Sequence, residues 1–214
     1  MKAVYATGTN YDDPLSMLEV GDMPKPETKP FWSTIRVKSA SVNHHDVWSL
    51  QGVGLADEQT PMILGTDAAG VLQEDIPVRK GLKAGSEVVL YTYIATDGSG
   101  VMTAERRSLL SEAYAGTLAE NTQVPSANVF AKPENLNFDE TAALGTSWLT
   151  AYSLLFTSAI VKPGDTVLVQ GAGGGVSTAA IQLAHAAGLE VFVTSRSEDK
   201  RNRALEIGAD AVFE

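Results

Sequence analysis

Hydrophobic and polar positions follow two different patterns in the two parts of this chain. Up to about residue 135, short runs of alternating or continuous apolar residues are separated by turns that contain Gly and Pro. We expect strands at 1–7, 34–42, 62–72, 87–94 and 117–124. Short strands at this density predict a compact β-rich domain of the barrel or sandwich type. A polar excursion covers 97–114, and 103–113 could form a surface helix within it.

After Lys132-Pro133 the pattern changes to long apolar helices that alternate with short buried strands. Asn137 is a candidate N-cap, with Glu140 three residues later, for a helix over 139–159. Further helices are expected at 178–187 and 198–207, each closed by Gly, and strands at Thr166–Gln170, Glu190–Thr194 and Ala211–Phe213. This β-α-β-α-β order predicts a parallel, doubly wound sheet.

The pattern therefore predicts two domains, a β-rich one over 1–135 and an α/β one over 136–214. A dinucleotide-binding sheet contains two halves, and only the first is expected here. We expect the chain to be a piece of a longer enzyme.

Composition narrows the possible partners. The formal net charge of −10 argues against nucleic acid, whose binding needs a basic face. The absence of cysteine excludes disulfides, thiolate metal sites and a cysteine nucleophile. No signal peptide is evident, and no apolar run reaches the length of a membrane span. The sequence predicts a cytoplasmic protein that acts on a small molecule, without a membrane partner.

The most informative motif is a glycine-rich turn between the first α/β strand and its helix. The sequence runs Gly171-Ala172-Gly173-Gly174-Gly175-Val176-Ser177. A turn without bulky side chains lets backbone N–H groups approach a pyrophosphate, and the following helix presents its positive N-terminus to the same group. We predict that Gly173, Gly174, Gly175 and Val176 bind a dinucleotide.

The end of the second strand indicates which dinucleotide. In NAD-binding sheets an Asp or Glu at this point binds the ribose hydroxyls. Here the chain reads Thr194-Ser195-Arg196-Ser197, with no acid at the strand tip. Ser195 can donate a hydrogen bond, and Arg196 with Lys200 can pair with a 2′-phosphate, although Arg196 could also be a solvated surface residue. NADP is therefore favoured over NAD.

With these residues in view, the chain resembles the medium-chain dehydrogenase/reductase family, in its zinc-independent, quinone-oxidoreductase-like branch. The matching segments lie at 1–4, 41–48 (SVNHHDVW), 63–71 (ILGTDAAGV), 116–120 (GTLAE), 149–152 and 161–169 (VKPGDTVLV). The resemblance implies a GroES-like catalytic domain followed by the first half of a Rossmann cofactor domain, with a homodimer for the full-length protein.

The resemblance also implies what the site lacks and which residues it uses. Zinc-dependent members carry a cysteine at the place of Asn43 and a His-Glu pair at the place of Thr66-Asp67, so no zinc is expected. Carried over by position, Asn43 could hydrogen-bond a substrate carbonyl and Asp46 could fix the loop or the cofactor. His45 falls where a proton relay lies in the zinc enzymes. His44 and Thr150 are expected near the cofactor.

The resemblance predicts an NADPH-dependent oxidoreductase that transfers hydride to a quinone, enone or carbonyl compound. Two alternatives stay open. The chain could bind nucleotide or a partner without turnover, or it could be a zinc alcohol dehydrogenase with atypical ligands. Either His44 or His45 could also be merely packed or solvated.

Overall fold

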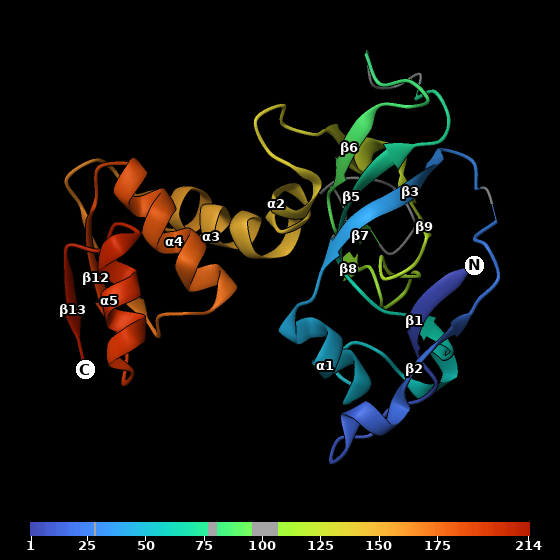
Figure 1. Cartoon of the computed structure of the whole chain (residues 1–214), viewed down its shortest axis with the longest axis horizontal. Helices are drawn as coiled ribbons and strands as arrows, with labels where there is room; N and C mark the ends of the chain where they lie inside the picture. Colours follow the sequence, from blue (N-terminus) through green and yellow to red (C-terminus); the bar gives the residue numbers. More distant parts are fainter. Residues whose placement is uncertain (28, 77–80, 96–106) are drawn as a thin grey trace. The chain divides into compact units, whose positions relative to one another are not determined.

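The computed structural model describes residues 1–27, 29–76, 81–95 and 107–214. The chain divides into two compact units, Met1–Gly145 and Thr146–Glu214 (Figure 1). The first unit is β-rich and the second contains a parallel sheet with helices, as the sequence predicted. These units do not test the expected domain boundary at 135/136, which stays a prediction.

The first unit is built on a five-stranded antiparallel sheet in the order β10-β6-β5-β3-β9. These strands are β3 (Trp32–Ser41), β5 (Asp67–Leu72), β6 (Glu87–Leu90), β9 (Asn121–Pro125) and β10 (Val129–Ala131). A three-stranded sheet joins β2 (Leu18–Asp22), β1 (Lys2–Ala6) and β4 (Met62–Ile63), and β7 (Tyr93–Ala95) pairs with β8 (Arg107–Leu109). Fully buried residues such as Ile35, Val88 and Val124 form the core of the large sheet.

Two expected strands are each interrupted. The run at 62–72 is split into β4 and β5 by Gly65, whose φ of 95° is outside the extended range. The run at 87–94 forms β6 and the start of β7. The strands β2, β8 and β10 were not predicted.

The expected surface helix at 103–113 is wrong where the structure describes it. Residues 103–106 lie outside the described residues, and 107–109 form β8. Ser111 has a φ of 68°, which no helical residue adopts. The Glu112 carboxylate also accepts hydrogen bonds from the Leu109 amide (2.9 Å) and the Ser108 hydroxyl (3.0 Å), which closes a turn.

Among its described residues the first unit also has two short α-helices, α1 (His44–Leu50) after β3 and α2 (Phe138–Ala142) at its end, besides three 3-10 turns. Asn137 caps α2 by accepting the Glu140 amide at 2.9 Å, as the capping-box pattern predicted. The expected continuous helix at 139–159 instead alternates between α and π turns: Leu144–Trp148 and Ser153–Ser158 are π-helical, on either side of α3 (Leu149–Tyr152). At the start of the first π turn the backbone of Gly145 lies close to the Asp67 carboxylate. A Cβ on Gly145 would be only 2.5 Å from Asp67 Oδ1.

The second unit holds the parallel sheet β11-β12-β13, formed by Thr166–Gln170, Glu190–Thr194 and Ala211–Phe213. All three strands match the prediction. The helices α4 (Gly175–Ala186) and α5 (Glu198–Glu206) pack on the sheet through Val169, Val191 and Val193. Helix α4 begins three residues earlier than expected, directly on the glycine turn. Within the described residues, no helix combines the length and apolar character needed to cross a bilayer.

Candidate functional site

The glycine turn of the second unit leaves its backbone open to a ligand. Gly171 and Gly173 have φ values of 81° and 94°, which L side chains rarely adopt, and Gly173, Gly174 and Gly175 are exposed. Gly174 is the N-cap of α4, so the free N–H groups of the helix start lie at this turn. A Cβ on Gly173 would lie 2.9 Å from Lys200 Cδ, so the Lys200 side chain passes directly over the turn.

The predicted specificity residues gather beside this turn. A groove of about 520 Å³ is lined by Gly171, Ala172, Thr194, Ser195, Arg196, Ser197, Lys200 and Glu214. The Thr194 carbonyl accepts the amides of Gly171 (3.1 Å) and Ala172 (3.0 Å), which ties the strand tip to the glycine turn. Arg196 is exposed and, among the described residues, forms no ion pair. Its guanidinium is therefore available to an anionic ligand in the groove.

In the first unit, a buried polar cluster surrounds Asn43 at the start of α1. The Asn43 amide nitrogen donates to Asp67 Oδ2 (2.9 Å), to Thr66 Oγ1 (3.1 Å) and to Ser41 Oγ (3.3 Å). The Ser41 hydroxyl donates to the same Asp67 oxygen at 2.7 Å. Asp67 is 1% exposed and Thr66 is fully buried. These contacts fix the Asn43 amide before any substrate is present.

Asp46 holds the loop that carries this cluster. Its carboxylate accepts hydrogen bonds from the backbone N–H groups of Asn43 (2.8 Å) and Gly65 (3.0 Å). Burial raises the pKa of Asp46, although the two backbone hydrogen bonds act in the opposite direction. The side chain thus joins the start of α1 to the chain just before β5.

The two predicted histidines point to different surroundings. His44 is exposed and lies against the half-exposed Trp48 ring, with centroids 6.1 Å apart. His45 is buried, and its Nε2 lies 3.0 Å from Glu112 Oε1. Its Nδ1 is 3.4 Å from the Ser111 hydroxyl and 3.5 Å from the Ser49 hydroxyl. The structure therefore brings Asn43 and Asp46 together, and it places His45 in a separate pair with Glu112.

Known protein families match both units. The family model of the alcohol dehydrogenase GroES-like domain matches residues 29–134, and the model of the zinc-binding dehydrogenase matches 175–214. The crotonyl-CoA reductase of Streptomyces avermitilis is 31% identical over 96% of this chain, and the quinone oxidoreductase of Homo sapiens is 31% identical over 90%. The chain belongs to the medium-chain dehydrogenase/reductase family.

A solved structure described as an NAD-dependent alcohol dehydrogenase gives a TM-score of 0.88 at 39% identity, over 99% of this chain and 63% of the other. The chain spans about half the length of the curated relatives it matches, with 52% of both the Streptomyces and the human protein covered. The resemblance to the medium-chain dehydrogenase/reductase family is thus confirmed, and members of this family use NAD(P).

The residues of this medium-chain dehydrogenase/reductase do not fit a zinc site. Zinc in proteins prefers thiolate and imidazole ligands. Asn43, Thr66 and Asp67 offer an amide, a hydroxyl and a single carboxylate, and the chain has no cysteine. Within the described ranges no group of three or more His, Asp or Glu could hold a metal ion. A nicotinamide dinucleotide does fit, because the glycine turn has the open backbone that a pyrophosphate needs.

Sequence reasoning missed Glu112, which organises the loop opposite α1. Besides His45, Leu109 and Ser108, its surroundings include Gly54, where a Cβ would lie only 2.6 Å from Glu112 Oε1. The residue stands in a polar excursion and pairs with a histidine 67 positions away, so no local pattern signals it. A histidine that is buried requires a hydrogen-bond partner. A packed His45 therefore predicts some polar partner, but the sequence does not identify it as Glu112.

We expect Glu112 to make the first unit sensitive to acid. Burial opposes its ionisation, but the hydrogen bonds from His45, Leu109 and Ser108 outweigh this effect and lower its pKa. A carboxyl whose folded pKa is below its unfolded value stabilises the fold above the unfolded pKa, and this contribution is lost as pH falls through the folded pKa. Glu112→Gln should therefore lose stability near neutral pH and approach the parent chain below about pH 4. Urea unfolding at several pH values measures this, and a pH-independent difference would contradict it.

Proposed function

We propose that this chain is part of an NADPH-dependent oxidoreductase that reduces a quinone, enone or carbonyl compound without zinc. The observation that carries the proposal is the groove beside the glycine turn, where Ser195, Arg196 and Lys200 meet and the tip of β12 has no acid. The full-length homodimer and the cytoplasmic location expected from the sequence are part of the same proposal.

In this proposal the second unit supplies the nucleotide site. The N–H groups around Gly173–Val176 and the start of α4 bind the pyrophosphate. Arg196 and Lys200 bind the 2′-phosphate, with Ser195 beside them. The alkyl chain of Lys200 lies beside Gly173, which keeps the ammonium group close to the turn. NADPH, when bound, supplies the hydride.

In the first unit we propose that Asn43 orients the acceptor carbonyl. Its amide nitrogen carries two hydrogens and has three protein acceptors within 3.3 Å, so a substrate oxygen would take the place of the longest contact, that to Ser41. Asp46 and His45 act as positioning residues, since both are buried and tied to neighbouring loops. His44 and Thr150 are assigned to the cofactor from the family resemblance.

A second candidate is nucleotide binding without turnover. It is favoured for the 214-residue chain because the chain covers only 52% of its reductase relatives. Both candidates require the nucleotide site, so binding is the property to measure first.

We expect NADPH to bind about tenfold more tightly than NADH, and Arg196→Ala to remove most of this preference. Isothermal titration of both nucleotides against the parent chain, Arg196→Ala and the control Arg36→Ala measures it. Arg36 is an exposed arginine on β3, outside the groove, and its loss should change neither affinity. Equal binding of the two nucleotides by the parent chain would reject the assignment of NADPH.

A further inference from the structure

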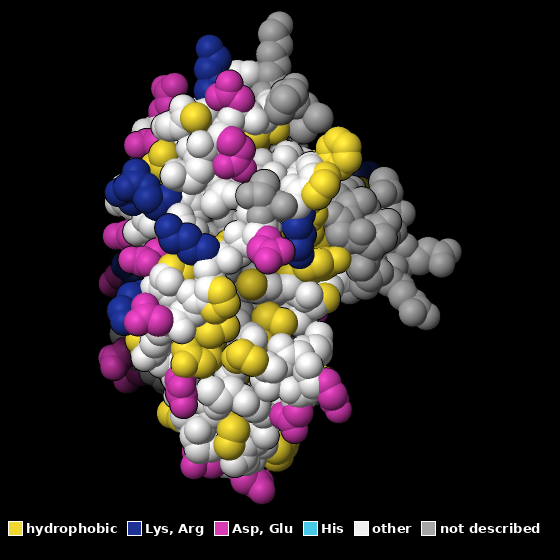
Figure 2. Space-filling model, turned by 90° about the vertical axis from the view of Figure 1, so that its right-hand side faces the viewer, with side chains coloured by type: hydrophobic (Ala, Val, Ile, Leu, Met, Phe, Trp, Pro, Cys, Tyr) yellow, Lys and Arg dark blue, Asp and Glu magenta, His cyan; other side chains and the backbone are white. Residues whose placement is uncertain are grey.

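The first unit contains a cavity that none of the candidate site residues described above lines. It has a volume of about 310 Å³ and is formed by the start of the chain, the segment before β3, β4, the turn before β9, and β9 itself. Ligand sites for small molecules begin at about this size. Figure 2 shows hydrophobic side chains gathered on this side of the molecule, with basic and acidic side chains along their border.

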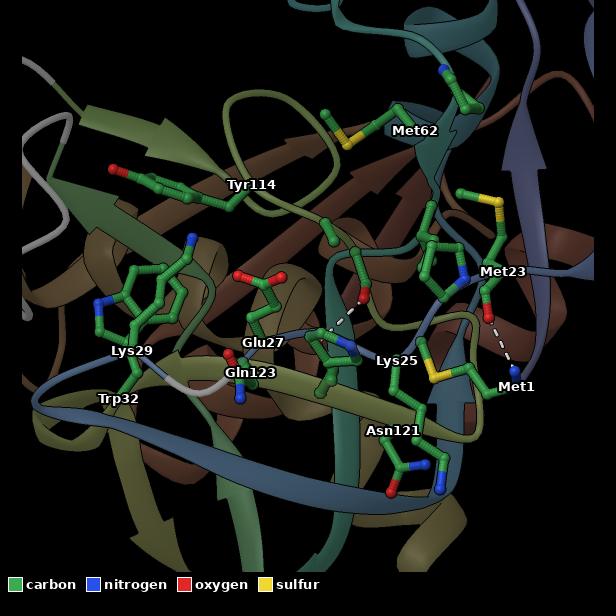
Figure 3. Close-up of a pocket in the computed structure, with 17 residues that line it drawn as sticks. Met1, Met23, Lys25, Glu27, Lys29, Trp32, Met62, Tyr114, Asn121 and Gln123 are labelled. Atoms are coloured by element: carbon green, nitrogen blue, oxygen red, sulfur yellow. Dashed lines mark hydrogen bonds between the residues drawn. The ribbon is translucent and has the colours of Figure 1, made fainter.

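One wall of the cavity is aromatic and carries a cation. The rings of Trp32 and Tyr114 lie 5.1 Å apart at 55°. Lys29 Nζ lies 4.6 Å from the Trp32 centroid and 5.3 Å from the Tyr114 centroid. Figure 3 shows Lys29, Trp32 and Tyr114 on one side of the cavity, and Met23 and Met62 on the other. Methionine side chains adapt to what they contact and pack favourably against aromatic rings, so this second wall can accept a ring.

The charge at the rim is mainly positive. Lys25 and Lys29 line the cavity together with one acid, Glu27, and all three are exposed. In the described part of the chain, neither lysine has a carboxylate at ion-pair distance. Lys25 and Lys29 therefore give this rim a positive charge, in a chain whose net charge is −10. This arrangement complements an aromatic anion.

A polar group at the cavity adds a hydrogen-bonding requirement. Gln123 is 7% exposed and donates from its amide nitrogen to Thr34 Oγ1 at 3.1 Å. Its amide oxygen is buried and has no hydrogen-bond partner among the described residues. Figure 3 shows this oxygen on the side of Glu27 and the nitrogen turned away from it. A buried acceptor without a donor is costly, and a ligand hydroxyl that reaches it would remove that cost.

We propose that this cavity binds a small aromatic carboxylate that carries a hydroxyl on its ring. The ring packs between the Trp32–Tyr114 wall and the methionines, the carboxylate pairs with Lys29 and Lys25, and the hydroxyl donates to Gln123 Oε1. The proposal does not depend on nucleotide binding, since every residue involved lies in the first unit and outside the Asn43 cluster.

Three probes with related rings test each part of the proposal on the whole 214-residue chain. The first is para-hydroxyphenylacetate, the second is phenylacetate, which lacks the hydroxyl, and the third is tyramine, which has the same phenol but an ammonium in place of the carboxylate. A ligand of this size should bind with a Kd of about 1 mM, measurable by ligand-observed NMR. Phenylacetate should bind about fivefold more weakly, and tyramine more weakly still.

Two variants locate the site. Lys29→Met keeps an apolar chain over the aromatic rings and removes the charge, so it should weaken para-hydroxyphenylacetate about fivefold. Lys38→Met makes the same change at an exposed lysine on β3, outside the cavity, and should have no effect. Circular dichroism verifies that both variants are folded.

Any one of the following three results would overturn the proposal. Tyramine binding as tightly as para-hydroxyphenylacetate would show that the site does not select an anion. Equal effects of Lys29→Met and Lys38→Met, or none from either, would place the ligand elsewhere. Absence of binding for all three probes up to about 10 mM would show that the cavity is not a ligand site.

Discussion

Replacing Gly173 by alanine should abolish tight nucleotide binding, while the same replacement at Gly164 should leave it intact. Both glycines have φ near 90°, so each substitution costs about 1 kcal/mol of backbone strain. Nothing lies within 4 Å of a Cβ on Gly164, but a Cβ on Gly173 would lie 2.9 Å from Lys200 Cδ. Alanine at Gly173 must therefore push Lys200 away from the turn, and it also obstructs the approach of the pyrophosphate.

We expect the NADPH affinity of Gly173→Ala to fall about a hundredfold, because both the turn and Lys200 are disturbed. Gly164→Ala should retain the parent affinity at a similar loss of stability. Calorimetric titration and urea unfolding of the same preparations separate the two effects. If the variants lose affinity equally, the loss reflects general destabilisation of the second unit, and the turn has no special role.

The second large effect is expected at Asp46. Asp46→Ala leaves the amides of Asn43 and Gly65 without their acceptor in a buried place, which should cost roughly 3 kcal/mol of unfolding free energy. Asp46→Asn retains one acceptor oxygen and avoids the burial of a charge, so its cost should be about half. Denaturant unfolding of the parent and both variants measures the difference.

Asp57 provides a matched control, because its carboxylate also accepts two hydrogen bonds, from the amide and the hydroxyl of Thr9 at 2.7 and 2.8 Å. Asp57 is exposed, so water can replace the carboxylate, and Asp57→Ala should cost less than about 1 kcal/mol. If Asp46→Ala were as stable as Asp57→Ala, the burial of the Asn43 and Gly65 backbone amides would add nothing to the cost in unfolding free energy.

The three strands and the last two helices of the α/β half could be predicted closely, although the helix expected at 139–159 alternates between α and π turns. Its strands are apolar, its helices end at glycines, and the strands that pair are neighbours in sequence, so local patterns carry most of the information. The β-rich half was predicted in outline only. Gly65 divides one apolar run into two strands of different sheets, and that division depends on a backbone angle that the alternation of residues does not reveal.

The same contrast holds for the candidate site. Ser195, Arg196 and Lys200 could be placed together because they follow one strand and begin one helix. The partners of Asn43 and His45 could not be predicted in this way. Asp67 and Glu112 lie 24 and 67 residues from them, and only the folded sheet and loops bring these groups into contact.

The pairing of β3 affects how the chain folds while it is being synthesised. One edge of β3 pairs with β5 and the other edge pairs with β9. Trp32 therefore cannot pair with Pro125 until most of the first unit has been synthesised. A strand with an open edge is prone to pair with other chains. In the sheet β11-β12-β13 each strand pairs with the next strand along the chain, so its pairings need no distant segment. The last part of this sequence to leave the ribosome therefore has the simplest route to its fold, whereas the earlier part has the longest exposure to misassembly.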